Sequence, residues 1–217
     1  SLRNAHYTSP EVISAMWDGL TESGFKGGRI LEPSVGIGHF FGMMPDSMMD
    51  SSEFDAVERD SISARISRLL YPSSSVTHAP YQDVPVPDEY YDLIISNVPF
   101  GQGTVNDSFD PDLKKLKQPV HNFFFLKSLK KLREGGVAAF ITSRYTMDGK
   151  SNIREKIEEM GGRFVGAVRL PNNAFKGIAD TGVTTDIIFI QKDSSASEPW
   201  QKTEKQGPFE YNEYYHT

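Results

Sequence analysis

Residues 29–42 read RILEPSVGIGHFFG, and the class of the fold follows from this stretch and its surroundings. Its first four residues form a short apolar run that predicts a strand, and its end predicts a helix. Between them lie Gly36 and Gly38, which allow a sharp turn and a close approach of the backbone to a ligand. The N-terminus of the following helix adds unpaired N–H groups. A dinucleotide fingerprint would need a third glycine where Phe41 stands.

On both sides of this loop, apolar runs alternate with helix-like segments. The runs LIIS, AAFIT and DIIFIQ are almost continuously apolar, as expected of strands covered on both faces. The predicted strands are 29–32, 54–58, 75–78, 91–96, 137–142, 163–170 and 186–191. The predicted helices are 10–20, 37–44, 61–70, 120–132 and 151–160. This alternation predicts an α/β fold with a doubly wound, mainly parallel, seven-stranded sheet of the Rossmann-like type. The last two strands are expected to pair in antiparallel fashion at the sheet edge.

The composition is that of a soluble globular protein, with 38% hydrophobic and 24% charged residues among 217. No apolar run approaches the roughly 18 residues of a membrane span, and no leader opens the chain, so a cytoplasmic protein is predicted. The absence of cysteine excludes disulfides, thiolate metal sites and cysteine nucleophiles, and no metal is expected. Residues 1–192 are predicted to form one domain, followed by a polar linker and the stub of an extension over 193–217. The start at Ser1 suggests a piece of a longer protein.

The formal net charge of −6 does not indicate a nucleic-acid binder, but the charges are unevenly distributed. Residues 46–92 hold ten acidic side chains against three arginines, and residues 111–150 hold nine basic side chains against three acidic ones. This division permits one face for a polyanion, although solvated helix faces explain it equally well.

Polar residues stand where the predicted strands end, which is the usual ligand crevice of an open α/β sheet. Glu32 and Ser34 flank the glycine turn. Glu58 closes the second strand, where a carboxylate can accept hydrogen bonds from both ribose hydroxyls of a nucleoside. Asp83, after the third strand, can accept from an adenine amino group or cap a turn. These residues predict a nucleoside-binding edge.

The fourth strand runs into Asn97-Val98-Pro99-Phe100. Asn97 offers an amide oxygen, and the Val98 carbonyl is held outward because a residue before proline is confined to extended conformations. Two acceptors side by side can bind both hydrogens of one –NH₂ group. Phe100 offers a flat face on which a planar ring can stack.

These residues resemble the catalytic domain of S-adenosylmethionine-dependent DNA methyltransferases that act on amino groups, in particular the N6-adenine class. The resemblance covers residues 4 to about 192. LEPSVGIGHF resembles the cofactor loop, VERD the ribose-binding strand end, YQD the adenine-contacting segment and NVPFG the catalytic tetrapeptide, with valine in place of the first proline. The resemblance implies cofactor contacts from Tyr7, Thr8, Glu32, Pro33, Ser34, Gly36, Gly38, Glu58 and Asp83.

The same resemblance implies DNA as substrate. The catalytic group would be Asn97, Val98, Pro99 and Phe100, and LPNNAFKG would supply Phe175 as the second wall around a base flipped out of the duplex. Lys114, Lys115, Lys117 and Arg144 are candidates for phosphate contacts, whereas Lys127, Lys130, Lys131 and Arg133 are expected on the polar side of a helix. The whole arrangement is similar to methylase segments joined to helicase-like proteins of phages and mobile elements, which implies a larger polypeptide or a specificity module as partner.

Three other functions stay open at this stage. A glutamine-amide protein methyltransferase presents the same planar –NH₂ to the same tetrapeptide. A degenerate module that binds cofactor or DNA without catalysis is a different class. A Rossmann oxidoreductase is disfavoured by Phe41 and by the tetrapeptide.

Overall fold

The computed structural model describes residues 8–99, 103–149, 152–171, 184–195, 200, 202–206 and 209–216. The helices are α1 (Pro10–Glu22), α2 (His39–Gly42), α3 (Asp46–Met49), α4 (Ser61–Leu70), α5 (Pro111–Leu116), α6 (Val120–Lys131), α7 (Tyr145–Asp148) and α8 (Ile153–Glu159), with 3₁₀ turns η2 (Tyr81–Asp83) and η3 (Glu213–His216). The strands are β1 (Arg29–Glu32), β2 (Glu53–Glu58), β3 (Ser75–His78), β4 (Tyr91–Asn97), β5 (Thr104–Val105), β6 (Gln118–Pro119), β7 (Leu132–Ser143), β8 (Gly162–Arg169), β9 (Thr185–Lys192), β10 (Thr203–Gln206) and β11 (Phe209–Asn212).

Seven strands form one sheet in the order β3-β2-β1-β4-β7-β9-β8. The five strands from β3 to β7 pair in parallel, whereas β9 is antiparallel to both β7 and the edge strand β8. The predicted α/β class with a mainly parallel seven-stranded sheet is therefore confirmed. The chain leaves β1 toward β2 in one direction and returns through β4 on the other side, so β1 and β4 flank the topological switch point. Ligands of open α/β sheets bind at this point.

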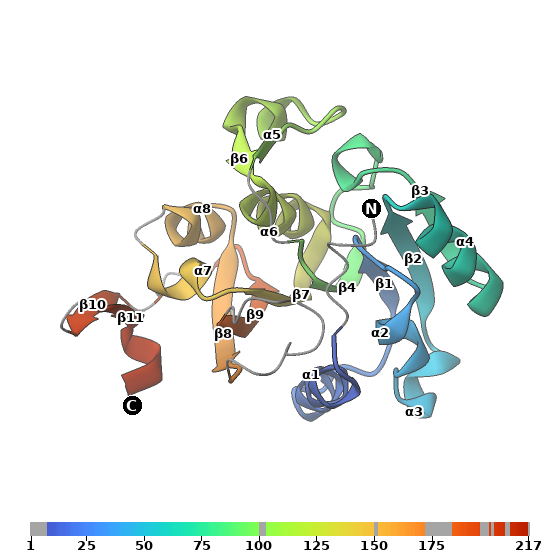
Figure 1. The fold of residues 1–217 in the computed structure, drawn as a ribbon, viewed down its shortest axis with the longest axis horizontal. Coiled ribbons are helices and arrows are strands. Elements are labelled where there is room, and N and C mark those ends of the chain that lie inside the picture. The colour runs from blue at the N-terminus through green and yellow to red at the C-terminus, as the bar shows by residue number, and fades with distance from the viewer. Residues whose placement is uncertain are drawn as a thin grey trace.

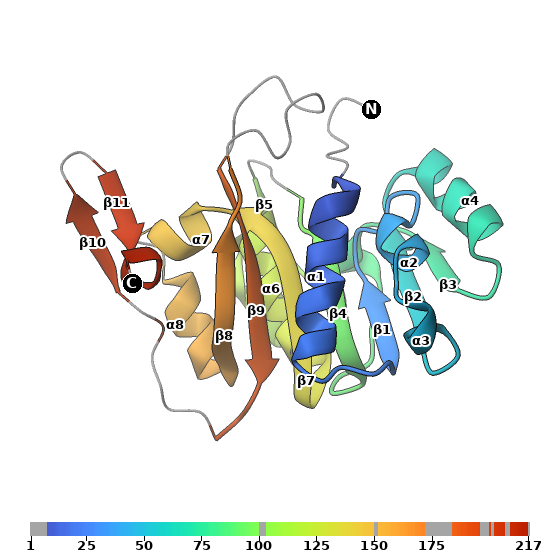
Figure 2. The ribbon, with the colours of Figure 1, turned by 90° about the horizontal axis from the view of Figure 1, so that it is seen from below.

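Helices cover both faces of the sheet (Figures 1 and 2). On one face, α1 packs its buried side chains, including Trp17, against strand residues such as Ile30 and Leu93. On the other face, α6 packs over β7 and α8 over β8, and Phe125 of α6 meets Phe140 of β7 edge to face at 5.0 Å between ring centroids. The central strands are buried on both sides, which explains their continuously apolar sequences.

Most predicted elements match the observed ones to within two residues, but several regions differ. The strand predicted over 137–142 is β7, which already begins at Leu132. The helix predicted over 37–44 is a single turn, α2, followed by the separate turn α3. The stretch 101–119 carried no predicted element, yet its described part holds α5 between β5 and β6, which pair with each other. None of the described helices has the length and apolar character to cross a membrane.

The described part of 193–217 packs against the rest of the fold beside α7 (Figure 1). Asn212 is fully buried; its N–H donates to the Asp148 carboxylate at 2.9 Å and its side-chain amide to the Met147 carbonyl at 3.2 Å. Asp148 also pairs with Arg169 at 2.9 Å. The tail therefore contributes to a buried charged cluster, while the domain boundary at 192 stays a prediction.

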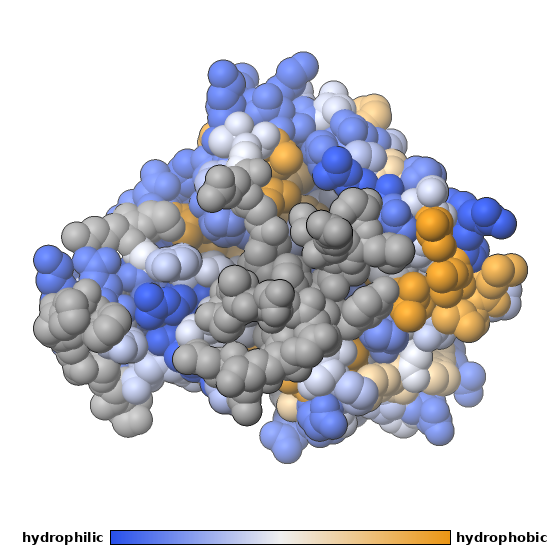
Figure 3. Space-filling model, in the orientation of Figure 1, coloured by the Kyte–Doolittle hydropathy of each residue, from blue (hydrophilic) through white to orange (hydrophobic). Residues whose placement is uncertain are grey.

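Apolar side chains are exposed along one side of α4, which Figure 3 shows as the hydrophobic surface at the right. Ile62, Ile66, Leu69 and Leu70 follow helical spacing, and Leu69 is 81% exposed. The side of α4 that packs on β2 and β3 carries the small residues Ala64 and Ser67. This helix thus turns its larger apolar side chains to the surface.

Candidate active site

Three predicted site residues lie at the carboxyl ends of neighbouring parallel strands. Glu32 ends β1, Glu58 ends β2 and Asn97 ends β4, with β1 between the other two. The register pairs Glu32 with Ala56 of β2. Because parallel strands end at one edge of the sheet, the fold brings the glycine loop, the acidic strand end and the start of the tetrapeptide together.

The glycine loop after β1 is held by the carboxylate of Glu58. One carboxylate oxygen accepts a hydrogen bond from the N–H of Gly36 at 2.7 Å, and the other accepts one from the N–H of Asp60 at 2.6 Å. Each oxygen keeps a second lone pair, so the predicted contacts to ribose hydroxyls stay compatible with this geometry. Glu58 therefore shapes the loop as well as facing the site.

Glycine is required at position 38. Its φ of +90° lies in the left-handed region, and a Cβ there would collide with the ring of Tyr71. Beyond this turn, the indole N–H of Trp17 donates to the Phe40 carbonyl at 3.0 Å and ties the loop to α1. Gly36 also has a positive φ, of +57°, and a Cβ on it would meet no atom within 4 Å, so the loop backbone is open at that point.

Glu32 has a buried carboxyl group with one unpartnered oxygen. The residue is 2% exposed, and its Oε2 has no hydrogen-bond partner among the described residues. Burial, and then the nearby charge of Glu58, raise the pKa of Glu32 well above its usual range. A buried acceptor in this state favours a cationic or hydrogen-bond-donating ligand.

Asn97 is oriented from the opposite end of the sequence. Its side-chain N–H donates to the hydroxyl oxygen of Thr8 at 3.1 Å. Thr8 is placed there because Ser9 caps α1 and Pro10 occupies its first turn, which fixes where the helix begins. The hydrogen bond holds the amide in place at the end of β4, with its nitrogen toward Thr8 and its Oδ1 buried.

Val98 follows β4 directly. Its N–H donates to the Ile141 carbonyl at 3.0 Å, and its side chain is fully buried in the core. Pro99 follows, half-buried. The start of the tetrapeptide is therefore anchored by the buried Val98 side chain, whereas Asn97 remains partly exposed. Phe100, Tyr7 and Phe175, which were predicted to contact base or cofactor, lie outside the described residues.

The other predicted residues fall into two groups. Pro33 and Ser34 lie in the turn directly after β1, and Asp83 ends η2 after β3, so these belong to the same edge of the sheet. Lys114 and Lys115 lie exposed on α5, which packs on α6 away from the strand ends (Figure 1). Arg144 precedes α7 at the end of β7, with its guanidinium 4.0 Å from the Asp148 carboxylate.

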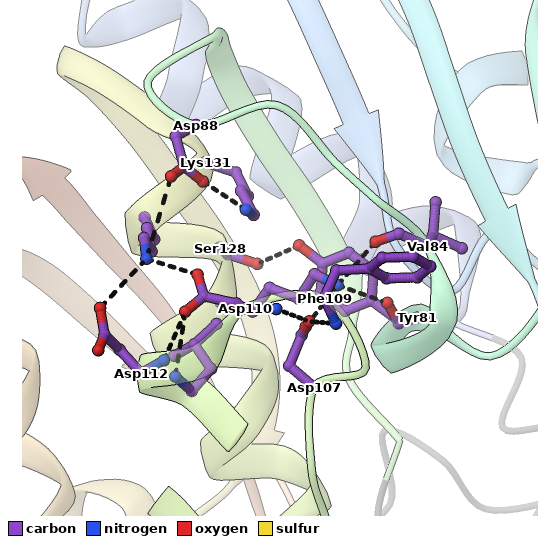
Figure 4. Close-up of polar contacts among 12 residues, drawn as sticks. Tyr81, Val84, Asp88, Asp107, Phe109, Asp110, Asp112, Ser128 and Lys131 are labelled. Carbon is purple, nitrogen blue, oxygen red and sulfur yellow. Dashed lines mark hydrogen bonds and ion pairs between the residues drawn. The ribbon is translucent and has the colours of Figure 1, made fainter. Parts of the chain in front are cut away.

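The prediction that Lys127 lies on the polar side of its helix is wrong. Lys127 is 1% exposed and pairs at 2.7 Å with Asp107, which is equally buried. Its ammonium also donates to the carbonyls of Tyr81, at 2.7 Å, and Val84, at 3.0 Å. Lys131, 6% exposed, pairs with Asp88 (Figure 4). The insertion 103–119 covers what would otherwise be the solvated face of α6.

The topology and the side chains at the strand ends define a Rossmann-like domain of the methyltransferase type. The model of the N-6 DNA Methylase family matches residues 53–207, and the chain belongs to that family. The resemblance drawn from the motifs is thereby confirmed.

Individual relatives have low sequence identity to this chain. The chain is 28% identical over 190 residues to "Defense against restriction protein B" of Escherichia phage P1, covering 86% of this chain but only 8% of the phage protein. The methyltransferase subunit of a type I restriction-modification system from Streptococcus thermophilus has a TM-score of 0.71 at 17% identity, covering 86% of this chain and 45% of that one. Geranyl diphosphate methyltransferase in complex with SAM (S-adenosylmethionine) has a TM-score of 0.59 at 13% identity, with 84% and 85% covered. The two structural likenesses show the fold.

Proposed function

We propose that this chain transfers a methyl group from S-adenosylmethionine to the N6 amino group of a flipped-out adenine in DNA. The observation that carries the proposal is the placement of Asn97. Its amide is oriented by Thr8 at the end of β4, beside the glycine loop that follows β1. A loop that binds the methyl donor and an amide that accepts hydrogen bonds, on neighbouring strands, suit the transfer of a methyl group to an exocyclic amine. Membership of the N-6 DNA Methylase family supports this choice of substrate.

The residues present fit the cofactor. S-adenosylmethionine carries an ammonium group, a sulfonium group and ribose hydroxyls. The unpartnered Oε2 of Glu32 is a buried acceptor suited to the ammonium, and Glu58 retains lone pairs for the hydroxyls. The open backbone at Gly36 allows a ligand to come close. When bound, this cofactor supplies an activated methyl group.

The chain's own contribution is alignment and polarisation of the substrate. The lone pair on adenine N6 is delocalised into the ring, which makes the amine a poor nucleophile. The Asn97 amide oxygen and the Val98 carbonyl, as two acceptors for the two N–H bonds, would localise that lone pair and aim it. Holding the reacting groups in line can contribute several kcal/mol, and no enzyme nucleophile is required. The surplus proton on N6 leaves to water.

The flipped base and the DNA backbone need further contacts. We assign those with the base to Phe100 and Phe175, and those with the DNA backbone to Lys114, Lys115 and Arg144. The aromatic side chains would stack on the flipped base, for about 1–3 kcal/mol each, and the cations would meet phosphate oxygens. Sequence recognition requires base-edge contacts in a groove, which we assign to the insertion 101–119 or to a further part of a longer polypeptide. The small share of the phage relative that the chain covers supports the second source.

The test combines cofactor binding with product analysis. Calorimetry would measure the Kd for S-adenosylmethionine and for NAD. Tritiated methyl transfer onto mixed-sequence duplexes, followed by digestion to nucleosides, would identify the methylated atom. The variant Asn97→Ala is expected to bind cofactor normally and to lose at least about a hundredfold in transfer rate, the size seen for removal of one oriented polar group in a site. The matched control is Asn152→Ala, which alters an exposed asparagine at the start of α8 that makes no capping bond.

Each alternative has its own outcome. A methyl group found on a protein glutamine and not on DNA would identify a glutamine-amide protein methyltransferase. Cofactor binding without transfer to any acceptor would identify a non-catalytic module. Binding of NAD in preference to S-adenosylmethionine would identify an oxidoreductase.

A further inference from the structure

The insertion after the tetrapeptide is fastened to η2, the turn that carries Asp83. The N–H of Ser108 donates to the Gln82 carbonyl at 2.9 Å, and the Ser108 hydroxyl donates to one carboxylate oxygen of Asp83. The carboxylate itself is exposed. Ser108 therefore fixes the direction of a side chain that would otherwise be free to choose among rotamers.

Asp107, which directly precedes Ser108 in the chain, belongs to a buried ion pair (Figure 4). The Lys127 ammonium donates hydrogen bonds to the carbonyls of Tyr81, in η2, and Val84, directly after it. It also forms an ion pair with the Asp107 carboxylate. One cation therefore joins α6, η2 and the insertion at a single point.

Asp107 uses its other oxygen to shape the insertion. Its Oδ1 accepts the N–H groups of Phe109 and Asp110, each at 2.8 Å. This places Ser108 inside a tight turn whose two sides are anchored in the interior. A buried pair of this kind contributes to conformational specificity more reliably than to stability. Here the specified feature is the position of Ser108 over Asp83.

We propose that Ser108 is a positioning residue for recognition of the cofactor's adenine. It holds the Asp83 carboxylate, an acceptor-only group, toward the 6-amino group, and the Lys127–Asp107 pair holds Ser108. This proposal rests on the proposed function, because it assumes that the nucleoside bound at this edge is the adenosine of S-adenosylmethionine. A carboxylate fixed in this way accepts from an amino group and meets the carbonyl of hypoxanthine with repulsion, since both are acceptors.

The experiment compares two ligands that differ in the group on C6 and in the proton on N1 of the purine. S-adenosylhomocysteine and its deaminated analogue, in which hypoxanthine replaces adenine, would be titrated by calorimetry into the full chain. The wild type is expected to prefer adenine by about tenfold or more, as expected when a polar group of a site is left unmatched. Ser108→Ala is expected to reduce that preference by about threefold to tenfold, the worth of one ordinary hydrogen bond at an exposed position. Ser108→Thr, which keeps the hydroxyl, should restore it.

The control is Ser73→Ala, which removes an exposed hydroxyl in the turn before β3, at the opposite end of that strand from Asp83. This change should leave the preference unaltered. Ser108 is itself exposed, so the variant retains the fold. A full adenine preference in Ser108→Ala, or no preference in a wild type that binds S-adenosylhomocysteine, would overturn the inference and leave the proposed function standing. A wild type that binds neither ligand would instead overturn the proposed function.

Discussion

The side-chain nitrogen of Asn97 lies 3.1 Å from the hydroxyl oxygen of Thr8, although 89 residues separate them along the chain. The bond crosses from the start of α1 to the end of β4. It gives the first residues of the fold a direct influence on the group proposed to hold the substrate amine.

Replacing Thr8 by valine keeps the shape and removes the acceptor. The Asn97 amide then loses a bond that holds it in place, so kcat for methyl transfer is expected to fall about tenfold, equivalent to about 1.4 kcal/mol. Single-turnover kinetics would measure the chemical step, and Thr8→Ser, which retains the hydroxyl, is the control. An unchanged kcat in Thr8→Val would contradict this role.

Glu32 is expected to lower the stability of the folded protein when it ionises and to strengthen the binding of the cofactor. Because burial raises its pKa in the folded protein, it binds a proton more tightly there than in the unfolded chain. Its contribution to stability is fully present below the unfolded pKa of about 4.3 and is lost as pH rises through the folded pKa. Glu32→Gln should therefore become increasingly more stable than the wild type as pH rises above about 4.3. Urea unfolding at several pH values would show this divergence.

The same variant should bind S-adenosylmethionine about tenfold more weakly, because the amide lacks the charge that would meet the ammonium group. Wild-type affinity should rise with pH as Glu32 ionises. If the stability difference between Glu32→Gln and the wild type did not change with pH, the Glu32 carboxylate would have to be stabilised in the folded protein by a partner.

Glu58 is expected to act through the loop as well as through the ribose. In Glu58→Gln, one of the two acceptor oxygens becomes an –NH₂ donor that faces a backbone N–H, either that of Gly36 or that of Asp60. The Kd for cofactor is expected to rise about ten- to a hundredfold, combining a lost loop contact with a lost ligand contact. Glu53→Gln, at the exposed start of the same strand, is the control. Equal affinity in the two variants would exclude Glu58 from the site.

The Lys127–Asp107 pair can be tested by unfolding alone. Lys127→Met leaves a carboxylate buried without its cation and should lower the free energy of unfolding by about 3–5 kcal/mol. Adding Asp107→Asn, which keeps an oxygen for the capped N–H groups, should recover part of that loss. Lys115→Met, at a position 77% exposed, should change stability by less than about 0.5 kcal/mol. Additive effects of the two buried substitutions would show that the pair is not coupled.

The sheet could be predicted closely because its strands are covered on both faces. Runs such as 93–95 and 187–190 contain no polar residue, and the glycine loop after β1 marks the ligand edge. The polar strand ends at Glu32, Glu58 and Asn97 followed from the same reasoning. These are local signals, and each depends on fewer than ten consecutive residues.

The contacts that shape the site depend on long-range pairing and could not be predicted. Lys127 stands in a helix whose pattern shows a polar side, yet that side is covered by an insertion whose two-residue strands have no detectable periodicity. Its partner Asp107 lies twenty residues upstream, in a stretch without an apolar pattern. The acceptor for Asn97 likewise lies at the other end of the sequence, and nothing in either segment indicates the other.

The C-terminal segment sets a practical boundary for recombinant versions of this domain. The Arg169 guanidinium binds Asp186 at 2.9 and 3.0 Å, and the ring of Tyr215 lies 4.1 Å from it. A version cut at residue 192 would open this ionic cluster to water and strip Asp148 of its contact with Asn212. Such a trimmed product should be poorly soluble and prone to proteolysis, so expression designs ought to retain the chain at least through Tyr215.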